Sequence, residues 1–471
     1  MGPSPNALAS AIHTIKAKAV FEGSQVDVHV RVAETEGTLW VDLCNENWEA
    51  VQITKSGWEV IQSRPIKFVR QTGMLSLPRP ARGGSLRDVD GFTTLAGDAL
   101  TLVKGFMLGC LRERGPFPIL ALIGEQGSGK TTLSRLLKRT VDPSKAATRC
   151  LPRDERDLMI AAEGQHILAL DNLSFVDEQM SDALCRLATG GGLSTRTLYT
   201  DRDETVFECE RPIILNAITD VLPRPDLIDR SIMVIVPALD ESRRRPESEF
   251  WRDFDKVHPS ILGALCDAAR LALRETKSLP VPAVRMADFT IFVSHGEKGL
   301  GLKDKAFLSA YENNRRDANE VALDLSPVAQ ALKAFFEVRH DWSGTAAGLL
   351  EELNFKVSDE VRRSREWPKT PRGLSGAIRR IIPNLRRAGF IITMDARESG
   401  TGRALIEAKS TESSSQPSQS SPTVTDEPIA NEPDTMSCDG CDGSDDSLTP
   451  AKVDGQAESL RIAFSEDTEL V

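Results

Sequence analysis

The sequence predicts an α/β fold in which a parallel sheet carries helices on both faces, with a smaller unit before it and another after it. Between about residues 90 and 290, short apolar runs alternate with helical segments, as they do in parallel sheets. The first 85 residues instead alternate apolar and polar side chains, which is typical of short antiparallel strands. Beyond residue 410 the chain is polar, acidic and rich in Ser and Pro, so it cannot bury enough apolar area to become ordered.

These changes in apolar pattern and composition predict four regions. They are a β-rich N-terminal domain over 1–85, the α/β domain over 90–290, a unit of helices and a small β-ribbon over 325–410, and a disordered acidic tail over 411–471. Residues 77–84 ("LPRPARGG") are expected to be a linker. Trp40, Trp48 and Trp58 follow the alternation of the N-terminal strands, so we expect core positions for them rather than stacking platforms for nucleic acid.

The net charge of −11 is concentrated at one end of the chain. Residues 411–471 hold fourteen acidic and two basic side chains, a net of −12, which leaves the other 410 residues at +1. The acidity of the whole chain therefore does not argue against nucleic-acid binding by the folded part.

The sequence gives no indication of secretion or of a membrane span. The start lacks a charged-then-apolar signal, and no apolar run has membrane-spanning length. Six of the eight cysteines are solitary, as reduced thiols are, and the CxxC at Cys438 and Cys441 has no second pair. The expected location is the cytoplasm, with no membrane partner.

The stretch "GEQGSGKT" (124–131) lies between an apolar strand, "PILALI", and a helical segment, "TTLSRLLKRT". This is the context in which glycines let backbone N–H groups wrap phosphates, a lysine reaches the β- and γ-phosphates, and a threonine ligates Mg²⁺ at a helix N-terminus. The pattern predicts a P-loop nucleoside triphosphatase fold that binds Mg-ATP. The predicted nucleotide contacts are Gly124, Glu125, Gln126, Gly127, Ser128, Gly129, Lys130, Thr131 and Thr132.

Polar residues end the neighbouring apolar strands. Asp171 follows "HILAL" and suits the Mg²⁺ of the nucleotide together with Thr131. Asn216 ends "PIILN", where its amide would hold the attacking water or sense the γ-phosphate, or merely cap a turn. Arg224 and Arg230 precede the strand "IMVIVP", and an arginine at that place would complete the site of a neighbouring subunit. We expect Arg230 to be this residue, since it abuts the strand.

This order of motifs resembles the AAA+ ATPases. The block from "LATGGGLSTRTLYT" to "LPRPDL" (187–227) is similar to the superfamily 3 helicase-like ATPases of the viral and phage primase-helicase type. Phage and mobile-element ATP-binding proteins contain a segment that residues 282–289 ("PAVRMADF") resemble. Their C-terminal winged helix is similar to residues 342–354 and 367–394. The resemblance implies an oligomeric ring and a DNA-moving hairpin ahead of the Asn-ended strand. No primase catalytic core is visible.

The chain departs from this pattern at the catalytic base. Related ATPases place a glutamate after the strand-ending aspartate, whereas here the next residue is Asn172, an amide that cannot take a proton. A well-positioned water with Mg²⁺ and an arginine from a neighbour still supports slow hydrolysis. Glu125, inside the phosphate loop, is our candidate for the base.

Two segments are candidates for contact with DNA. Residues 367–394 contain six basic side chains and no acid, and the apolar spacing places the arginines on one side of a helix that Pro383 should kink or restart. The hairpin over 195–210 is the second segment, although its own acids oppose phosphate. The predicted contacts are Lys369, Arg372, Arg379, Arg380, Arg386 and Arg387 in the first segment, and Arg196 and Arg202 in the second. A merely solvated basic face is the alternative for the first.

Together these features predict a helicase-like ATP hydrolase of a phage or mobile element. It would form a homo-oligomeric ring and act in replication on single-stranded or fork DNA. Two alternatives stay open: a P-loop switch in regulation or defence that does not unwind DNA, and an interaction protein in which ATP is structural.

Overall fold

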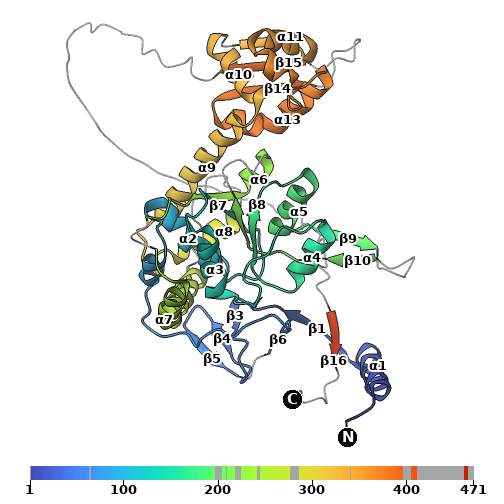
Figure 1. Ribbon diagram of the computed structural model, residues 1–471, viewed down its shortest axis with the longest axis vertical. Helices are drawn as coiled ribbons and strands as arrows, with labels where there is room; N and C mark the ends of the chain where they lie inside the picture. Colours follow the sequence, from blue (N-terminus) through green and yellow to red (C-terminus); the bar gives the residue numbers. More distant parts are fainter. Residues whose placement is uncertain are drawn as a thin grey trace, which may run out of the picture.

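The computed structural model describes residues 2–62, 65–191, 193–196, 204–207, 209–217, 224–240, 244–275, 286–339, 341–395, 405–410 and 461–464. At its centre is a parallel four-stranded sheet in the order β12-β7-β11-β8 (Figure 1). Its strands are β7 (Ile119–Ile123), β8 (Leu168–Leu173), β11 (Ile213–Ala217) and β12 (Ser231–Ile235). All of their pairings are parallel, so the carboxyl ends of the four strands lie along one edge.

Helices cover both faces of this sheet, which confirms the predicted α/β fold. Leu120 and Leu122 of β7 belong to a core formed with α2, α3, α7 and α8, whereas Ile119, Ala121 and Ile123 belong to a second core formed with α4, α5 and α6. A strand buried on both sides must be apolar at every position, which explains the run "ILALI". The helices are α2 (Gly97–Gly109), α3 (Lys130–Val141), α4 (Glu155–Glu163), α5 (Glu178–Thr189), α6 (Pro225–Asp229), α7 (Glu247–Arg274) and α8 (Ala287–Gly296).

The N-terminal region contains the predicted antiparallel meander. Strands β2 (Val32–Thr35), β3 (Thr38–Asp42), β4 (Ala50–Ile53) and β5 (Trp58–Ile61) pair in chain order. Trp40 and Trp58 are buried as expected, but Trp48 is half exposed and lies under the guanidinium of Arg70, 3.9 Å from its carbon to the ring centroid. The expectation of a core position is therefore wrong for Trp48, which lies in the turn before β4.

Two elements here differ from the expectation. Residues Pro5–Glu22 form helix α1, started by the Ser4 side-chain cap and by Pro5 in its first turn, although we expected strands. This helix buries none of its residues, so its apolar side chains show no period that a core would impose. Strand β1 (Ser24–His29) pairs with β6 (Lys67–Phe68) and with β16 (Arg461–Phe464), a short strand within the tail that we expected to lack structure.

The N-terminal sheet and the central domain share one core. Val41, Val51 and Ile53 belong to the same cluster as the helices that cover the central sheet, and β4 and β5 contact α7. The 77–84 segment between them lies against α7, where the Ala81 amide donates to the carbonyl oxygen of Pro259 at 2.8 Å. A short 3₁₀ helix, η1 (Leu86–Phe92), leads from this segment into α2. The boundary near residue 85 remains a prediction.

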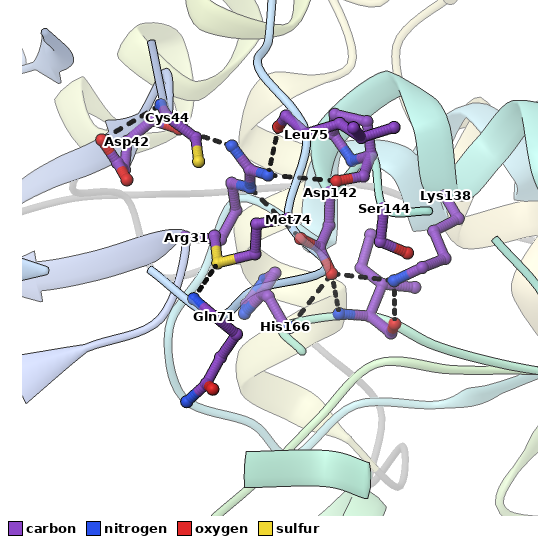
Figure 2. A network of polar contacts seen from close by, with 12 residues as sticks. Arg31, Asp42, Cys44, Gln71, Met74, Leu75, Lys138, Asp142, Ser144 and His166 are labelled. Carbon is purple, nitrogen blue, oxygen red and sulfur yellow. Dashed lines mark hydrogen bonds and ion pairs between the residues drawn. The ribbon is translucent and has the colours of Figure 1, made fainter. Parts of the chain in front are cut away.

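A buried polar network fastens this sheet to the phosphate-loop helix (Figure 2). Arg31, which lies just before β2, donates from Nε to Asp142 Oδ1 at 3.1 Å, and Lys138 of α3 donates to Asp142 Oδ2 at 2.9 Å. The backbone amides of His166 and Ile167, just ahead of β8, donate to the same Oδ2, each at 3.0 Å. Asp142 therefore joins the N-terminal sheet, the end of α3 and the start of β8.

The long helix α9 (Ala306–Asp324) leads from the central domain to the C-terminal unit, as Figure 1 shows. This unit has a core of its own and a three-stranded antiparallel sheet in the order β13-β15-β14. Helix α13 continues through Pro383, so it does not restart there, and the alternative that we expected, a kink, stays a prediction. The elements are α10 (Pro327–Val338), β13 (Asp341–Thr345), α11 (Ala346–Lys356), α12 (Asp359–Arg363), α13 (Pro371–Arg387), β14 (Phe390–Asp395) and β15 (Leu405–Ser410).

Candidate functional site

The loop "GEQGSGKT" connects β7 to α3 at the carboxyl edge of the sheet. Gly127 and Gly129 have φ of +82° and +89°, a backbone conformation that L side chains adopt at a cost. A Cβ on Gly124 would lie 2.5 Å from the carbonyl oxygen of Val236, which follows β12. The glycines of the motif are therefore needed both for the turn of the loop and for its contact with the chain after β12.

Lys130, the first residue of α3, reaches back over this loop. Its Nζ donates to the carbonyl oxygens of Gly124 at 2.6 Å and Glu125 at 2.7 Å. Partial burial lowers the pKa of Lys130, and the nearby carboxylate of Asp171 opposes this effect. The ammonium group is thus held at the centre of the loop, where the motif requires it. Thr132, the last predicted nucleotide contact, lies half-buried in the first turn of α3.

Asp171 is in contact with two other predicted site residues, Thr131 and Asn216. Its Oδ1 accepts a hydrogen bond from Thr131 Oγ1 at 3.2 Å and another from Asn216 Nδ2 at 2.8 Å. The pairing of β11 with β8 shifts register between Leu215 and Ala217, so Asn216 lies opposite the irregularity of β8 that contains Asp171 and Asn172. Asn216, 45 positions from Asp171, comes from the adjacent strand β11, and Thr131, 40 positions away, comes from the first turn of α3, which follows β7.

The side chain of Asn216 is almost fully buried, with 2% of the residue exposed. Its Oδ1 has no hydrogen-bond partner among the residues that the structure describes. A buried amide oxygen without a donor costs free energy, so such a group calls for a ligand or a water. The amide is consequently bound to Asp171 on one side and open to a donor on the other.

Asn172 is exposed and has φ of +58°, in the left-handed region. Asn and Asp are the non-glycine residues that enter this region most readily. Its backbone amide donates to Asp171 Oδ1 at 2.9 Å, so the turn after β8 also fixes the aspartate. Glu125 and Gln126 are exposed in the loop, and nothing in the contacts of Glu125 tests its role as the base.

The oxygens of Thr131 and Asp171 suit Mg²⁺. This ion prefers oxygen ligands and is commonly held by one or two protein oxygens together with phosphates and water. Within the described part of the chain, no cluster of three or more His, Cys, Asp or Glu residues could hold a metal ion by itself.

The two arginines before β12 lie within reach of carboxylates of this same chain. Arg230 Nε is 3.3 Å from Asp226 Oδ2, and its Nη1 donates to Thr189 Oγ1 at 3.1 Å. Arg224 Nη1 is 3.2 Å from both Glu178 Oε1 and Asp182 Oδ1. Both guanidinium groups are therefore occupied within one chain.

Sequence reasoning missed one basic residue beside the phosphate loop. Arg244 Nη2 lies 3.9 Å from the position that a Cβ on Gly127 would take. Arg244 belongs to the run "RRRP" (243–246) that follows β12 and leads into α7. Three consecutive arginines close after a sheet strand were the signal that could have identified it.

Helix α13 presents the predicted basic surface. Leu374, Ile378, Ile381 and Leu385 are buried on its inner side. The arginines at 372, 379, 380, 386 and 387 are exposed. Arg387 differs from the others, because its Nη1 binds Asp229 Oδ1 at 2.5 Å, an oxygen that also accepts from Arg315 at 3.0 Å.

The remaining predicted contacts are placed as follows. Lys369 is exposed and donates to the carbonyl oxygen of Arg362. The predicted hairpin is present as β9 (Leu193–Arg196) paired with β10 (Glu204–Phe207). The side chain of Arg196 and the whole of Arg202 lie outside the described residues.

None of the described helices is both long enough and apolar enough to span a membrane.

Comparison with known proteins gives a family match over two ranges. Residues 86–320 match the model of the actinomycete integrative conjugative element replication protein. Residues 328–421 match the model of the C-terminal domain of that replication protein, RepA. No curated protein matches the sequence of the chain.

Solved structures are similar to the chain at low identity. One structure of the C-terminal region of NrS-1 has a TM-score of 0.32 and 11% identity, and the match covers 77% of this chain and 94% of that one. Another structure of that region has a TM-score of 0.30 and 10% identity, with the same coverage of 77% and 94%. The JCV helicase gives a TM-score of 0.21 and 13% identity over 47% of this chain and 66% of that one.

The first family match ends at residue 320, near the end of α9, and the second begins at residue 328, in the first turn of α10. Over both units, the chain is similar to the replication protein of actinomycete integrative conjugative elements.

Proposed function

We propose that this protein is a Mg-ATP-dependent, helicase-like ATPase that acts on DNA during replication of an integrated mobile element. The observation that carries the ATPase proposal is the meeting of Thr131, Asp171 and Asn216 at the carboxyl edge of the sheet, next to Lys130. The match to a replication protein supports the replicative role.

Each residue has a distinct task in this proposal. The amides of the loop and Lys130 bind the phosphates, while Lys130 exchanges the Gly124 and Glu125 carbonyls for phosphate oxygens. Thr131 and Asp171 would hold Mg²⁺, which neutralises charge that develops on the phosphates. Asn216 Oδ1, buried and without a donor among the described residues, accepts a hydrogen bond from the attacking water and orients it.

The proton of that water has no acceptor next to Asp171, because Asn172 is an amide. Glu125 stays our proposal for the base. Phosphoryl transfer depends mainly on positioning and charge stabilisation, so the reaction does not require a strong base. We therefore propose slow turnover that rises when subunits assemble or DNA binds.

Assembly would supply an arginine in trans. Arg230 is held by Asp226 and Thr189 within one chain, so its role in a ring requires it to leave these partners. This pair is only partly buried, with 20% and 44% of the two side chains exposed, so leaving it costs less than a transition-state contact contributes. We propose a homo-oligomeric ring in which Arg230 faces the phosphate loop of the neighbouring subunit.

DNA binding is assigned to the C-terminal unit, which we propose is a winged helix. The order of helices α10 to α13 with a small antiparallel sheet fits this fold, and α13 presents its exposed arginines along one side. Among the described residues, Lys369, Arg372, Arg379, Arg380 and Arg386 have no carboxylate within ion-pair distance, so they are available to phosphates. Single-stranded or fork DNA is the proposed substrate.

The test is ATP hydrolysis by the purified chain with and without single-stranded DNA, alongside Lys130→Ala. We expect slow basal turnover, stimulation by DNA, and loss of turnover in the variant. Equal turnover by the Lys130→Ala protein would overturn the assignment of the loop.

One observation favours a second candidate function. Asn172 deprives the site of the adjacent base, which suits a P-loop switch that hydrolyses ATP slowly and does not unwind DNA. A strand-displacement assay separates the two functions, because only the helicase releases the displaced strand. Binding of ATP without any turnover would instead indicate a structural role for the nucleotide.

A further inference from the structure

We infer that Arg244 binds the triphosphate chain of the nucleotide from the same subunit, as a second cation beside Lys130. This inference rests on the proposed function, since it assumes that the loop at 124–131 holds a nucleoside triphosphate. Neither the family matches nor the sequence motifs assign a role to Arg244.

The first support is the course of the chain after β12. Val236 donates to the carbonyl oxygen of Ile123 at 2.7 Å, and its own carbonyl oxygen lies against Gly124. Eight residues later, Arg244 Nη2 approaches Gly127, 3.9 Å from where a Cβ would be. The chain after β12 therefore borders the phosphate loop at both of these glycines.

The second support is the contrast between two adjacent arginines. Arg245 is occupied: it donates to the carbonyl oxygen of Gly91 at 3.4 Å, and its guanidinium carbon lies 4.8 Å from the ring centroid of Phe250. Within the described part of the chain, Arg244 has no hydrogen bond or ion pair, and it is exposed. The anchored Arg245 holds the backbone in place, and Arg244 is left free to bind a ligand.

The third support is charge. A nucleoside triphosphate brings several negative charges to the loop, where Lys130 is the first cation. Arginine carries a fixed charge and presents several N–H donors in one plane, which suits phosphate oxygens. A guanidinium beside Gly127 is thus placed to bind the same phosphates that the loop amides wrap.

The experiment measures binding of ATP and of inorganic tripolyphosphate, each in competition with a fluorescent ATP analogue. Arg244→Ala is compared with Arg252→Ala, which removes one charge from an arginine of α7 that is 66% exposed and 3.9 Å from Asp253. We expect Arg244→Ala to weaken both ATP and tripolyphosphate by about tenfold or more, as loss of a charged hydrogen bond does. Arg252→Ala should leave both unchanged.

Two results would overturn the inference. If Arg244→Ala binds ATP and tripolyphosphate with the affinity of the parent, the inference is wrong. It is also wrong if the variant loses affinity for ATP but not for tripolyphosphate, because the arginine would then contact the ribose or the base. Arg244→Gln gives the same comparison if the alanine variant does not fold. Failure of the parent protein and of Arg252→Ala to bind ATP would refute the proposed function instead, so the two failures are distinguishable.

Discussion

Replacing Asp142 by Asn should destabilise the whole central domain. The carboxylate is fully buried and accepts hydrogen bonds from Arg31 at 3.1 Å and Lys138 at 2.9 Å, besides two backbone amides (Figure 2). Burial alone would raise the pKa of Asp142, but the charges of Lys138 and Arg31 outweigh it and hold the pKa well below its usual range. The variant keeps the shape of the side chain and leaves two cations without their anion.

The magnitude follows from what those cations retain. Removing one partner of a buried ion pair costs about 3–5 kcal/mol. Arg31 still donates to the carbonyl oxygens of Asp42 and Leu75 at 2.9 and 2.7 Å, and Lys138 to that of Ile167 at 2.6 Å. These contacts soften the loss, so we expect about 3 kcal/mol, a large share of the stability of an ordinary domain.

The assay is urea unfolding at pH 7, with Asp255→Asn as the matched control. Asp255 pairs with Arg139 at 2.7 Å, but both side chains are exposed, so the same chemical change should cost less than about 1 kcal/mol. Because the folded pKa of Asp142 is lowered, its contribution is complete at neutral pH and is lost only as pH falls below the unfolded value near 3.8. Equal losses in the two variants would refute the reasoning.

The Asp142→Asn variant also tests whether the buried network affects ATP binding in addition to stability. Helix α3 has 12 residues, so Asp142 lies about 18 Å along it from the phosphate loop. Folded Asp142→Asn protein should therefore bind ATP with the affinity of the parent. A loss of affinity in the folded protein would show instead that the network holds the loop in its binding conformation.

Three further predictions concern packing, pH and assembly. Gly263→Ala should cost about 1–3 kcal/mol or more in urea unfolding, because its Cβ would lie 1.8 Å from the carbonyl oxygen of Ala81, whereas Gly376→Ala, with open space at its Cβ, should be neutral or stabilising. Burial lowers the pKa of His258 to about 4, so stability should be full above pH 6.5 and fall by about 2 kcal/mol by pH 5, and His258→Gln should lack this part of the slope. Arg230→Ala should bind ATP normally but hydrolyse it about 10³-fold more slowly, and mixing it with Lys130→Ala should restore some turnover; a mixture that stays inactive, or turnover equal to the parent, would exclude Arg230 as the trans-acting residue.

The central sheet and its strand-end residues could be predicted because their signals are local. A run such as "ILALI" requires burial on both faces, and parallel pairing then brings Asp171 and Asn216 to one edge whatever their separation in sequence. The contact of Thr131 with Asp171 follows from the same geometry.

The contacts that escaped prediction depend on tertiary structure. Arg31 meets Asp142 across 111 residues, and Arg387 meets Asp229 across 158, so no spacing rule indicates either pair. Arg387 was predicted as a free cation because residues 367–394 contain no acid, but its carboxylate partner comes from α6. Arg244 was overlooked because its place depends on how the chain after β12 passes the loop. Helix α1 was overlooked because it buries nothing.

The left-handed backbone at Asn172 bears on why the expected glutamate is absent. A longer side chain in this region costs about 1–2 kcal/mol, whereas Asp and Asn enter it more readily. Asn172→Asp should therefore fold as well as the parent and retain or increase turnover, since it restores a carboxylate beside Asp171 without backbone strain. Asn172→Glu should lower the free energy of unfolding in urea by about 1 kcal/mol. This loss of stability distinguishes the effect of the backbone conformation from the effect of a carboxylate on turnover. If Asn172→Asp instead abolishes turnover while ATP binding stays normal, the amide itself takes part in the reaction, and the search for a base must leave this position.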